Sequence, residues 1–440
     1  MKLRILLVNP WIYDFAAYNL WAQPLGLFKV AEFLSAFDVE LSFIDCTDSF
    51  GVRHHGTGSY RSEIVPKPSV LGDVPRYYKR YGISIDDFAA HLKSKVHCDM
   101  VLMTSTMSYW YPGVQKAIEI IREEQGILPV ILGGIYATLY HEHASSLSGA
   151  DFVFKGPLHN GLLFALSTFG FKLKKKREQI PYYRLGLRER FEYAPLMTSM
   201  GCPFRCSYCA SSLLANKYER YPNALVVRDI AELLKMGARD FAFYDDALLV
   251  DPDQNIKPLL RQIIALGLPI RFHTPNGMHA KYIDPELAHL MKKAGFRTIR
   301  LGLETVNADL QRVSGAKVCN DDLEKAVTLL REAEFTKREI GVYIMYGLPG
   351  QRLSDVKESI TFLKRLDVRI NLNAFTPIKG TQSWNELTSH GMITDDLDPL
   401  LSNNTIFPLL YSGYDQDVIE AMKLDVKEYN AKQDGNIFID

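Results

Sequence analysis

Short apolar segments rich in β-branched and aromatic residues alternate with amphipathic helical segments along most of this 440-residue chain. Such alternation is typical of parallel α/β architecture, because each helix returns the chain to the edge where the next strand begins. The segments form two series, and the first contains five strand-like runs, at residues 3–10, 39–46, 99–105, 128–134 and 150–156. We predict that they build a doubly wound, Rossmann-like parallel sheet over residues 1–168.

The second series begins near residue 194 and contains six strand-like runs separated by segments of helix length. They lie at residues 194–200, 239–245, 269–274, 296–304, 339–347 and 370–376. Six units are fewer than the eight of a closed barrel, so the pattern permits an open barrel or a second doubly wound sheet. Residues 169–193 are rich in Lys and Arg and are interpreted as a solvated linker, and residues 386–440 as a helical C-terminal extension.

Charge and hydropathy exclude two classes of protein. Lys plus Arg and Asp plus Glu are equal at 51 each, so no net field attracts a polyanion and we do not expect nucleic-acid binding. The longest uncharged run, GILPVILGGIYATLY, is shorter than the roughly 18 residues that a membrane span needs. With six cysteines and no export signal, we expect a cytoplasmic protein whose clustered cysteines bind a metal or cluster.

Three cysteines, Cys202, Cys206 and Cys209, lie within eight residues directly after the first strand of the second series. Zinc sites usually pair two C-x-x-C units, or one such unit with two histidines, and neither arrangement occurs here. Three thiolates on one tight loop can hold three corners of a 4Fe-4S cube and leave one iron without a protein ligand. A three-cysteine zinc site completed by a distant histidine is the alternative.

The C-x-x-x-C-x-x-C spacing, with aromatic Tyr208 before the last cysteine, resembles the signature of the radical SAM superfamily. The resemblance covers roughly residues 194–385 and implies a partial (β/α)6 barrel there. It also implies that S-adenosylmethionine binds the open iron and is cleaved reductively to a 5′-deoxyadenosyl radical, which modifies a small-molecule substrate. An electron donor such as flavodoxin or ferredoxin would be a partner. A cluster-bearing sensor or electron carrier is the non-enzymatic alternative.

The same resemblance implies the contacts of S-adenosylmethionine. Asp245 and Asp246 would accept its ammonium, although an Asp pair also caps helices well. Arg300 would pair its carboxylate, or else pair with Glu304 on the same face of the strand. The ribose hydroxyls would meet Glu304 or Thr305. The turn that contains Gly347, Pro349 and Gly350 would place its backbone against the adenine, since glycine allows close approach.

The first domain resembles the cobalamin-binding-type domain found in a subgroup of these enzymes. Its predicted carboxyl-end loops are rich in aromatic residues, namely Trp11, Tyr13, Phe15, Tyr18, Trp21, Tyr109, Trp110, Tyr111 and Tyr136. These rings would line a pocket for a flat, largely apolar group such as a corrin, or they are ordinary core. The cobalt-ligating motif Asp-x-His-x-x-Gly is absent. The resemblance therefore implies cobalamin-dependent methyl transfer or ring formation without a histidine ligand, or a first domain that binds only substrate.

Overall fold

The computed structural model describes residues 2–47, 56, 58, 60–94, 97–156, 158–411 and 413–434. The chain divides into two compact units. Unit 1 comprises residues 1–189 and 397–403, and unit 2 comprises residues 190–396 and 404–440. Both units are built on a parallel sheet, so each has one edge at which all its strands end.

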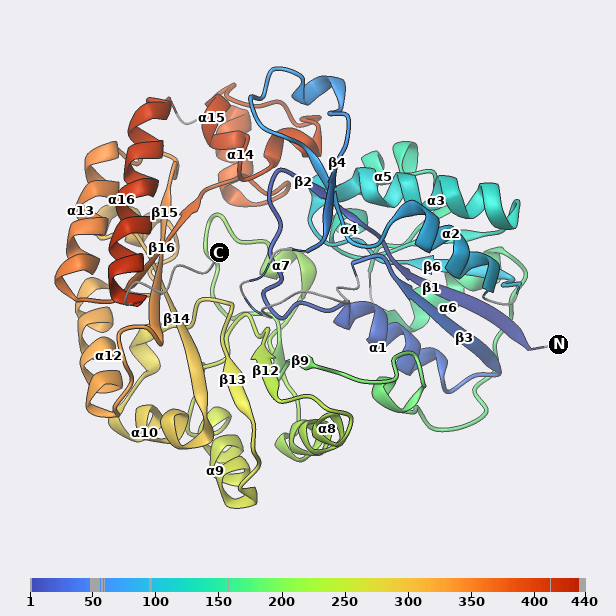
Figure 1. Cartoon of the computed structure of the whole chain (residues 1–440), viewed down its shortest axis with the longest axis horizontal. Coiled ribbons are helices and arrows are strands. Elements are labelled where there is room, and N and C mark those ends of the chain that lie inside the picture. Colours follow the sequence, from blue (N-terminus) through green and yellow to red (C-terminus); the bar gives the residue numbers. More distant parts are fainter. Residues whose placement is uncertain are drawn as a thin grey trace. The chain divides into compact units, whose positions relative to one another are not determined.

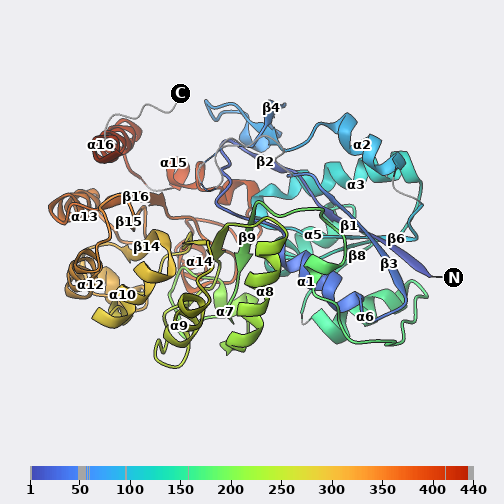
Figure 2. The same cartoon turned by 60° about the horizontal axis from the view of Figure 1, so that its bottom comes forward.

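The main sheet of unit 1 has five parallel strands in the order β3-β1-β6-β7-β8. The strands are β1 (Leu3–Asn9), β3 (Val39–Asp45), β6 (Met100–Met103), β7 (Val130–Leu132) and β8 (Phe152–Val153). The strand order reverses direction at β1, and Figure 2 shows α1 and α6 on one face of the sheet and α2 and α3 on the other. The predicted doubly wound sheet is confirmed.

The helices of unit 1 follow its strands as the amphipathic pattern predicts. They are α1 (Leu25–Leu34), α2 (Ile85–Ser94), α3 (Tyr111–Gln125), α4 (Ile135–Leu139), α5 (His141–Leu147) and α6 (Leu158–Thr168). Three 3₁₀ turns, η1 (Ser69–Leu71), η2 (Ser108–Trp110) and η3 (Tyr182–Arg184), complete the unit, and η5 (Pro399–Ser402) joins it from the far end of the sequence. A small antiparallel sheet of β2 (Ile12–Asp14), β5 (Lys79–Tyr81) and β4 (Ser62–Ile64) was not predicted, because strands of three residues are too short to show a period.

Unit 2 contains a six-stranded parallel sheet in which the strands follow one another in sequence order. They are β9 (Tyr193–Leu196), β12 (Asp240–Phe243), β13 (Arg271–His273), β14 (Phe296–Glu304), β15 (Ile340–Tyr346) and β16 (Arg369–Ala374). The terminal strands β9 and β16 do not pair with each other, so the sheet is open. Figure 1 shows α8, α9, α10, α12 and α13 along its outer side, and the predicted partial (β/α)6 barrel is confirmed.

The helices of unit 2 pack their apolar faces on this sheet, and Phe241, Phe243, Phe272 and Phe296 form a stack of rings between them. The helices are α7 (Ser211–Leu214), α8 (Asn223–Lys235), α9 (Ile256–Leu266), α10 (Pro285–Ala294), α11 (Ala308–Val313), α12 (Asn320–Glu332), α13 (Leu353–Arg365), α14 (Gln382–Ser389), α15 (Phe407–Tyr411) and α16 (Gln416–Asp434). The remaining short elements are β10 (Ser199–Met200), β11 (Glu219–Arg220) and η4 (Ala280–Tyr282).

The C-terminal segment is helical, as predicted, and its last helix covers an edge of the sheet. In α16, the Asn430 side chain accepts a hydrogen bond from the Ile370 backbone N–H at 3.0 Å and donates one to the Ile370 carbonyl at 2.8 Å. The amide therefore satisfies backbone groups that edge strand β16 would otherwise leave open. Within the described ranges, no helix combines the length and the apolar character required for a membrane crossing.

Candidate functional site

The cysteine loop of unit 2 starts from an anchored turn at the end of β9. Asp245, at the end of β12, is buried, and its carboxylate accepts hydrogen bonds from the backbone N–H and hydroxyl groups of both Thr198 and Ser199. All four donors reach Oδ1, at 2.7–2.9 Å. Burial raises the pKa of Asp245 to about 6, although the hydrogen bonds oppose that shift. Asp245 thus fixes the point from which the cysteine loop departs.

This geometry assigns the two predicted ammonium acceptors different roles. The four hydrogen bonds to Asp245 Oδ1 all come from Thr198 and Ser199, so this oxygen is already fully hydrogen-bonded within the chain. Asp246 is exposed and remains the member of the pair that can meet a ligand. Asp245 does not cap a helix either, because its partners lie at the junction of β9 and β10.

Close backbone packing defines the path of the loop. Gly201 has a φ of +78°, and a Cβ there would lie 2.5 Å from the Lys217 carbonyl oxygen. Gly315 has a φ of +127°, and a Cβ there would lie 2.9 Å from the Cα of Cys206. These two glycines are needed because a side chain at either position would push the loop away from its neighbours. The Ser207 N–H donates to the Ser314 carbonyl at 3.2 Å, which fastens the loop to the turn after α11.

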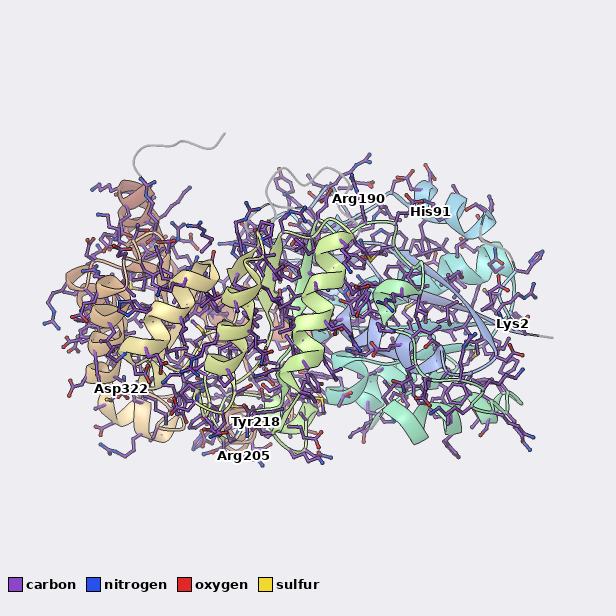
Figure 3. The ribbon with its side chains drawn as sticks, turned by 90° about the horizontal axis from the view of Figure 1, so that it is seen from below. Lys2, His91, Arg190, Arg205, Tyr218 and Asp322 are labelled. Carbon is purple, nitrogen blue, oxygen red and sulfur yellow. The ribbon has the colours of Figure 1, made fainter. Side chains whose placement is uncertain are left out.

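All three cysteines of the loop are free thiols of intermediate exposure. Burial raises the pKa of Cys202 to about 11, and the nearby Cys206 and Cys209 raise it further. Burial also raises the pKa of Cys206, against the effect of the Lys317 ammonium. Burial therefore favours the thiol form of Cys202 and Cys206, and binding a metal group would displace those protons. Arg205 is exposed and lies at the margin of the ribbon in Figure 3, so Lys317 is the cation placed to offset thiolate charge.

The spacing of the thiols argues against a single-ion site. Four ligands around one zinc ion lie only about 4 Å from one another, given Zn–S bonds near 2.3 Å. Among the described residues, no three His, Cys, Asp or Glu side chains are gathered closely enough to hold one metal ion. Three thiols on one loop that are close but not converged fit a larger group such as a cubane cluster, which spreads its ligands farther apart. The predicted alternative of a three-cysteine zinc site has no support in this arrangement.

A buried ion pair lies beside the loop. Lys317 Nζ donates to Glu304 Oε1 at 2.6 Å, and Nζ lies 5.5 Å from the centre of the Tyr208 ring. Glu304, the last residue of β14, has a φ of +69°, a strained conformation for a residue with a side chain. Burial raises the pKa of Tyr208 well above its usual value, although the Lys317 ammonium opposes that shift. The ion pair of Lys317 and Glu304 therefore lies against the cysteine loop, next to the ring of Tyr208.

The ion pair also decides between two predictions for β14. Glu304 pairs with Lys317, so the predicted alternative of an Arg300–Glu304 pair is wrong. Thr305 is buried, and its hydroxyl accepts from the Asn307 N–H at 3.2 Å, so the threonine serves the local turn. Glu304 keeps Oε2 outside the Lys317 hydrogen bond and is the better of the two candidates for a ligand hydroxyl.

The glycine turn after β15, for which adenine contact is predicted, adopts backbone conformations that favour glycine. Gly347 and Gly350 have φ values of +85° and +73°, and no atom lies within 4 Å of a Cβ built on Gly350. Gln351 supports the turn: its amide accepts from the Leu348 N–H at 3.2 Å and donates to the Met345 carbonyl at 3.0 Å. Pro349 lies between these contacts and is partly buried. Open space therefore lies beside Gly350, whereas the Tyr414 hydroxyl donates to the Gln351 carbonyl at 2.6 Å.

Sequence reasoning missed two residues of this site. Lys317 lies in an exposed-looking turn with no motif around it, and only the fold brings it to Glu304. His279, between β13 and α10, is buried and stacks on Phe204 of the cysteine loop, with ring centres 4.7 Å apart. Burial lowers the pKa of His279 to about 3, so the ring is neutral, and its Nδ1 has no hydrogen-bond partner. No local pattern distinguishes this histidine from any other in the sequence.

In unit 1, the aromatic residues are mostly core. Trp11, Phe15, Trp21, Tyr109, Tyr111 and Tyr136 are all buried. Trp11 packs edge-on against Phe88 and donates its indole N–H to the Ile83 carbonyl at 2.8 Å. The packing interpretation is therefore correct for these rings. Four other apolar side chains on the loops after β1, β6 and β7 are 36–61% exposed, namely Tyr18, Leu20, Met107 and Ile135.

Residues 196–363 match the family model described as the radical SAM superfamily. This segment of the chain is therefore similar to the radical SAM superfamily. The matched segment runs from the end of β9 to α13 and includes the cysteine loop, the Lys317–Glu304 pair and the glycine turn. The site described above therefore lies within the segment that matches the family model.

Two relatives and one solved structure are also similar to this chain. It is 27% identical over 224 residues to an uncharacterized methyltransferase of Pyrococcus horikoshii, covering 49% of this chain and 47% of that protein. It is 24% identical over 200 residues to bacteriochlorophyllide d C-12(1)-methyltransferase of Chlorobaculum tepidum, covering 44% and 42%. The chain thus matches about half the length of these relatives or less.

The solved structure is the radical S-adenosylmethionine methyltransferase TsrM of Kitasatospora setae with cobalamin and a 4Fe-4S cluster bound. Its fold matches 89% of this chain and 78% of its own length, with a TM-score of 0.63 and 18% sequence identity. The chain therefore shares a fold with TsrM over both units, from the doubly wound sheet to the open barrel.

Proposed function

We propose that this protein holds a 4Fe-4S cluster on Cys202, Cys206 and Cys209 and uses it to cleave S-adenosylmethionine, in order to modify a small organic molecule. The observation that carries the proposal is the cysteine loop itself. It offers three free thiols at the carboxyl edge of a parallel sheet, where α/β folds bind their ligands, and no fourth ligand from the described residues joins them. One iron of a bound cluster would therefore remain open to the cofactor.

When bound, the reduced cluster and S-adenosylmethionine supply a 5′-deoxyadenosyl radical that abstracts hydrogen from the substrate. The residues of the chain hold and shield these groups. The cysteine thiolates bind iron, and the Lys317 ammonium offsets part of their negative charge. Asp246 is placed to accept the cofactor ammonium, Glu304 Oε2 to accept a ribose hydroxyl, and the turn at Gly347, Pro349 and Gly350 to lie against the adenine.

Methyl transfer with cobalamin held by unit 1 is the finer proposal. Its support is threefold: the names of the relatives, the shared fold with TsrM, and the exposed apolar side chains Tyr18, Leu20, Met107 and Ile135. These side chains follow strands that end at one edge of the sheet, where doubly wound folds bind cofactors. Unit 1 offers no Asp-x-His-x-x-Gly motif, so cobalt would lack a histidine ligand from that motif. Flavodoxin or ferredoxin would supply the electron.

The cysteine assignment is tested with the anaerobic full-length protein reconstituted with iron and sulfide. Cys206→Ala should lose both the visible absorption of the cluster and reductant-dependent formation of 5′-deoxyadenosine. Cys319→Ser is the matched control, because Cys319 is a free and exposed thiol outside the loop. If Cys206→Ala kept full cleavage activity, the site assignment would be wrong. A cluster that forms but never cleaves S-adenosylmethionine would favour the sensor or electron carrier instead.

The cobalamin proposal needs a separate measurement. We would add hydroxocobalamin during reconstitution, desalt, and count corrin per chain from the visible spectrum. One corrin per chain is the expected result. If no corrin is retained, unit 1 serves the substrate alone, and the cluster chemistry stands without cobalamin.

A further inference from the structure

Arg300 is a partly buried cation with no acidic partner among the described residues. Its only side-chain hydrogen bond runs from Nη1 to the carbonyl oxygen of its own neighbour Ile299, at 3.0 Å. A guanidinium carries five N–H donors, so most of its donors are unused. Burial lowers its pKa to about 10, and nearby Arg369 lowers it further. A desolvated charge without a counter-ion is costly, and proteins keep such a charge where a ligand completes it.

The position of Arg300 separates it from the cysteine loop. Arg300 pairs in register with Gly341, whereas Glu304, which lies beside the loop, pairs with Ile344. A bulge lies between Gly302 and Glu304, so the separation follows the three-residue step from Gly341 to Ile344 on β15, about 10 Å. The guanidinium does not reach up toward Glu304: Nη1 lies 2.9 Å from the point where a Cβ of Gly341 would stand. Arg300 therefore marks a second, deeper level of the same sheet face.

Two polar groups from neighbouring strands come close together over Gly341. Because Gly341 has no side chain, Arg300 Nη1 and Asn371 Oδ1 both approach the point where its Cβ would stand, to 2.9 and 2.7 Å, and a Cβ there would clash with them. Asn371 Oδ1 is buried and accepts no hydrogen bond. Tyr343 alternates onto this face between Gly341 and Met345, and its hydroxyl is held by the Pro275 carbonyl at 2.7 Å. An unused donor fork, an unused acceptor and an aromatic ring thus lie on one face.

We propose that Arg300, Gly341 and Asn371 form a binding site for the carboxylate of the substrate, distinct from the site of S-adenosylmethionine. A guanidinium fork matches a carboxylate with two parallel hydrogen bonds. Asn371 Oδ1 would accept from an N–H or O–H next to that carboxylate, as in an amino or hydroxy acid. That the ligand is the substrate rests on the proposed function, but anion binding itself does not need cleavage activity. The carboxylate of S-adenosylmethionine is the other source of the same chemistry.

The first test measures binding of benzoate, with benzamide as its uncharged counterpart, to the reconstituted full-length protein by titration calorimetry. Wild-type protein should bind benzoate and not benzamide, and Arg300→Gln should weaken benzoate binding roughly tenfold or more. Arg297→Gln is the matched control, because Arg297 is an exposed arginine on the same strand. No benzoate binding by the wild type, or equal binding by Arg300→Gln, would overturn the proposal.

Two further measurements distinguish a substrate carboxylate from the carboxylate of S-adenosylmethionine, and show whether Arg300 is needed for folding. S-adenosylmethionine should bind Arg300→Gln with an affinity within about twofold of wild type; a tenfold loss would assign Arg300 to the cofactor and overturn the substrate site. Arg300→Met should melt at or above the wild-type temperature without ligand, because it removes an uncompensated charge. A lower melting temperature would show that Arg300 is structural. None of these measurements detects 5′-deoxyadenosine. A failure of this proposal can therefore be distinguished from a failure of the proposed function.

Discussion

Two buried aspartates follow strands in the two units, and they differ in how they distribute their hydrogen bonds. In unit 1, Asp14 Oδ1 accepts from the Phe15 N–H and Asn403 Nδ2, while Oδ2 accepts from Trp110 Nε1. In unit 2, one oxygen of Asp245 collects all four donors from Thr198 and Ser199, although the Thr198 N–H also lies 3.1 Å from Oδ2. Both carboxylates therefore accept hydrogen bonds from the protein itself and stabilise the local fold.

The comparison shows where ligand-binding capacity remains. Asp14 ties the distant segment 397–403 to unit 1, and its charge is matched by donors on both oxygens. Asp245 anchors the start of the cysteine loop. Beyond it, unit 2 keeps polar groups that the protein does not satisfy, namely Arg300, His279 Nδ1 and Asn371 Oδ1. Unpaired polar groups are expected at a ligand site, where the ligand completes them.

Removing the Asp245 carboxylate should give the largest loss of stability. Asp245→Ala leaves four donors around an empty space and should lower the free energy of unfolding by roughly 5 kcal/mol. Asp245→Asn keeps an oxygen where the four donors meet and should cost less than about 1 kcal/mol. Urea unfolding followed by circular dichroism measures both variants. Equal losses in the two would show that the second oxygen, and not Oδ1, supports the loop.

Breaking the ion pair beside the cysteine loop should have the next largest effect. Lys317→Met leaves Glu304 buried and unpaired and should cost roughly 3–4 kcal/mol. The double variant Lys317→Met with Glu304→Gln should recover much of that loss, because no lone charge remains. The double-mutant cycle in urea unfolding checks both results. Additive losses would mean that the two side chains do not depend on each other.

Asp14→Asn is the direct counterpart of Asp245→Asn. Because Asp14 uses both oxygens, the new amide NH₂ must face either Trp110 Nε1 or the donors of Phe15 and Asn403. We expect a loss of roughly 2 kcal/mol, the cost of one unsatisfied buried donor. If Asp14→Asn and Asp245→Asn lose the same free energy of unfolding in the urea experiment, the proposed difference between the two aspartates is wrong.

The pH dependence of stability tests whether the pKa of Asp245 is raised in the folded protein. Its folded pKa of about 6 lies above the value of about 3.9 in an unfolded chain, so the folded protein holds this proton more tightly. The stability that protonation of Asp245 contributes to the folded protein is therefore fully present below pH ~4 and is lost as the pH rises through about 6. The stability of wild type minus that of Asp245→Asn should fall across this window, by at most about 1.4 kcal/mol per pH unit. A flat difference would contradict the raised pKa.

Periodicity and spacing were sufficient to predict the two parallel sheets and the three clustered cysteines, because strands, helices and motifs are local in sequence. The choice of an open barrel came from the resemblance to the radical SAM superfamily. Periodicity and spacing were not sufficient to predict side-chain partners. Lys317 follows Glu304 by 13 positions, and nothing local indicates that their side chains pair or that Arg300 is left without a carboxylate. His279 reaches Phe204 across 75 positions by folding alone. Strands of two or three residues were missed because they carry no period.

The most direct test of the open iron is electron paramagnetic resonance of the reduced, reconstituted protein with and without S-adenosylmethionine. The account predicts a cluster signal in the wild type that changes when S-adenosylmethionine is added, because the cofactor binds the iron that Cys202, Cys206 and Cys209 leave open. An unchanged signal, at a cofactor concentration shown by equilibrium dialysis to saturate the protein, would contradict it and would mean that the fourth iron is already held by the protein.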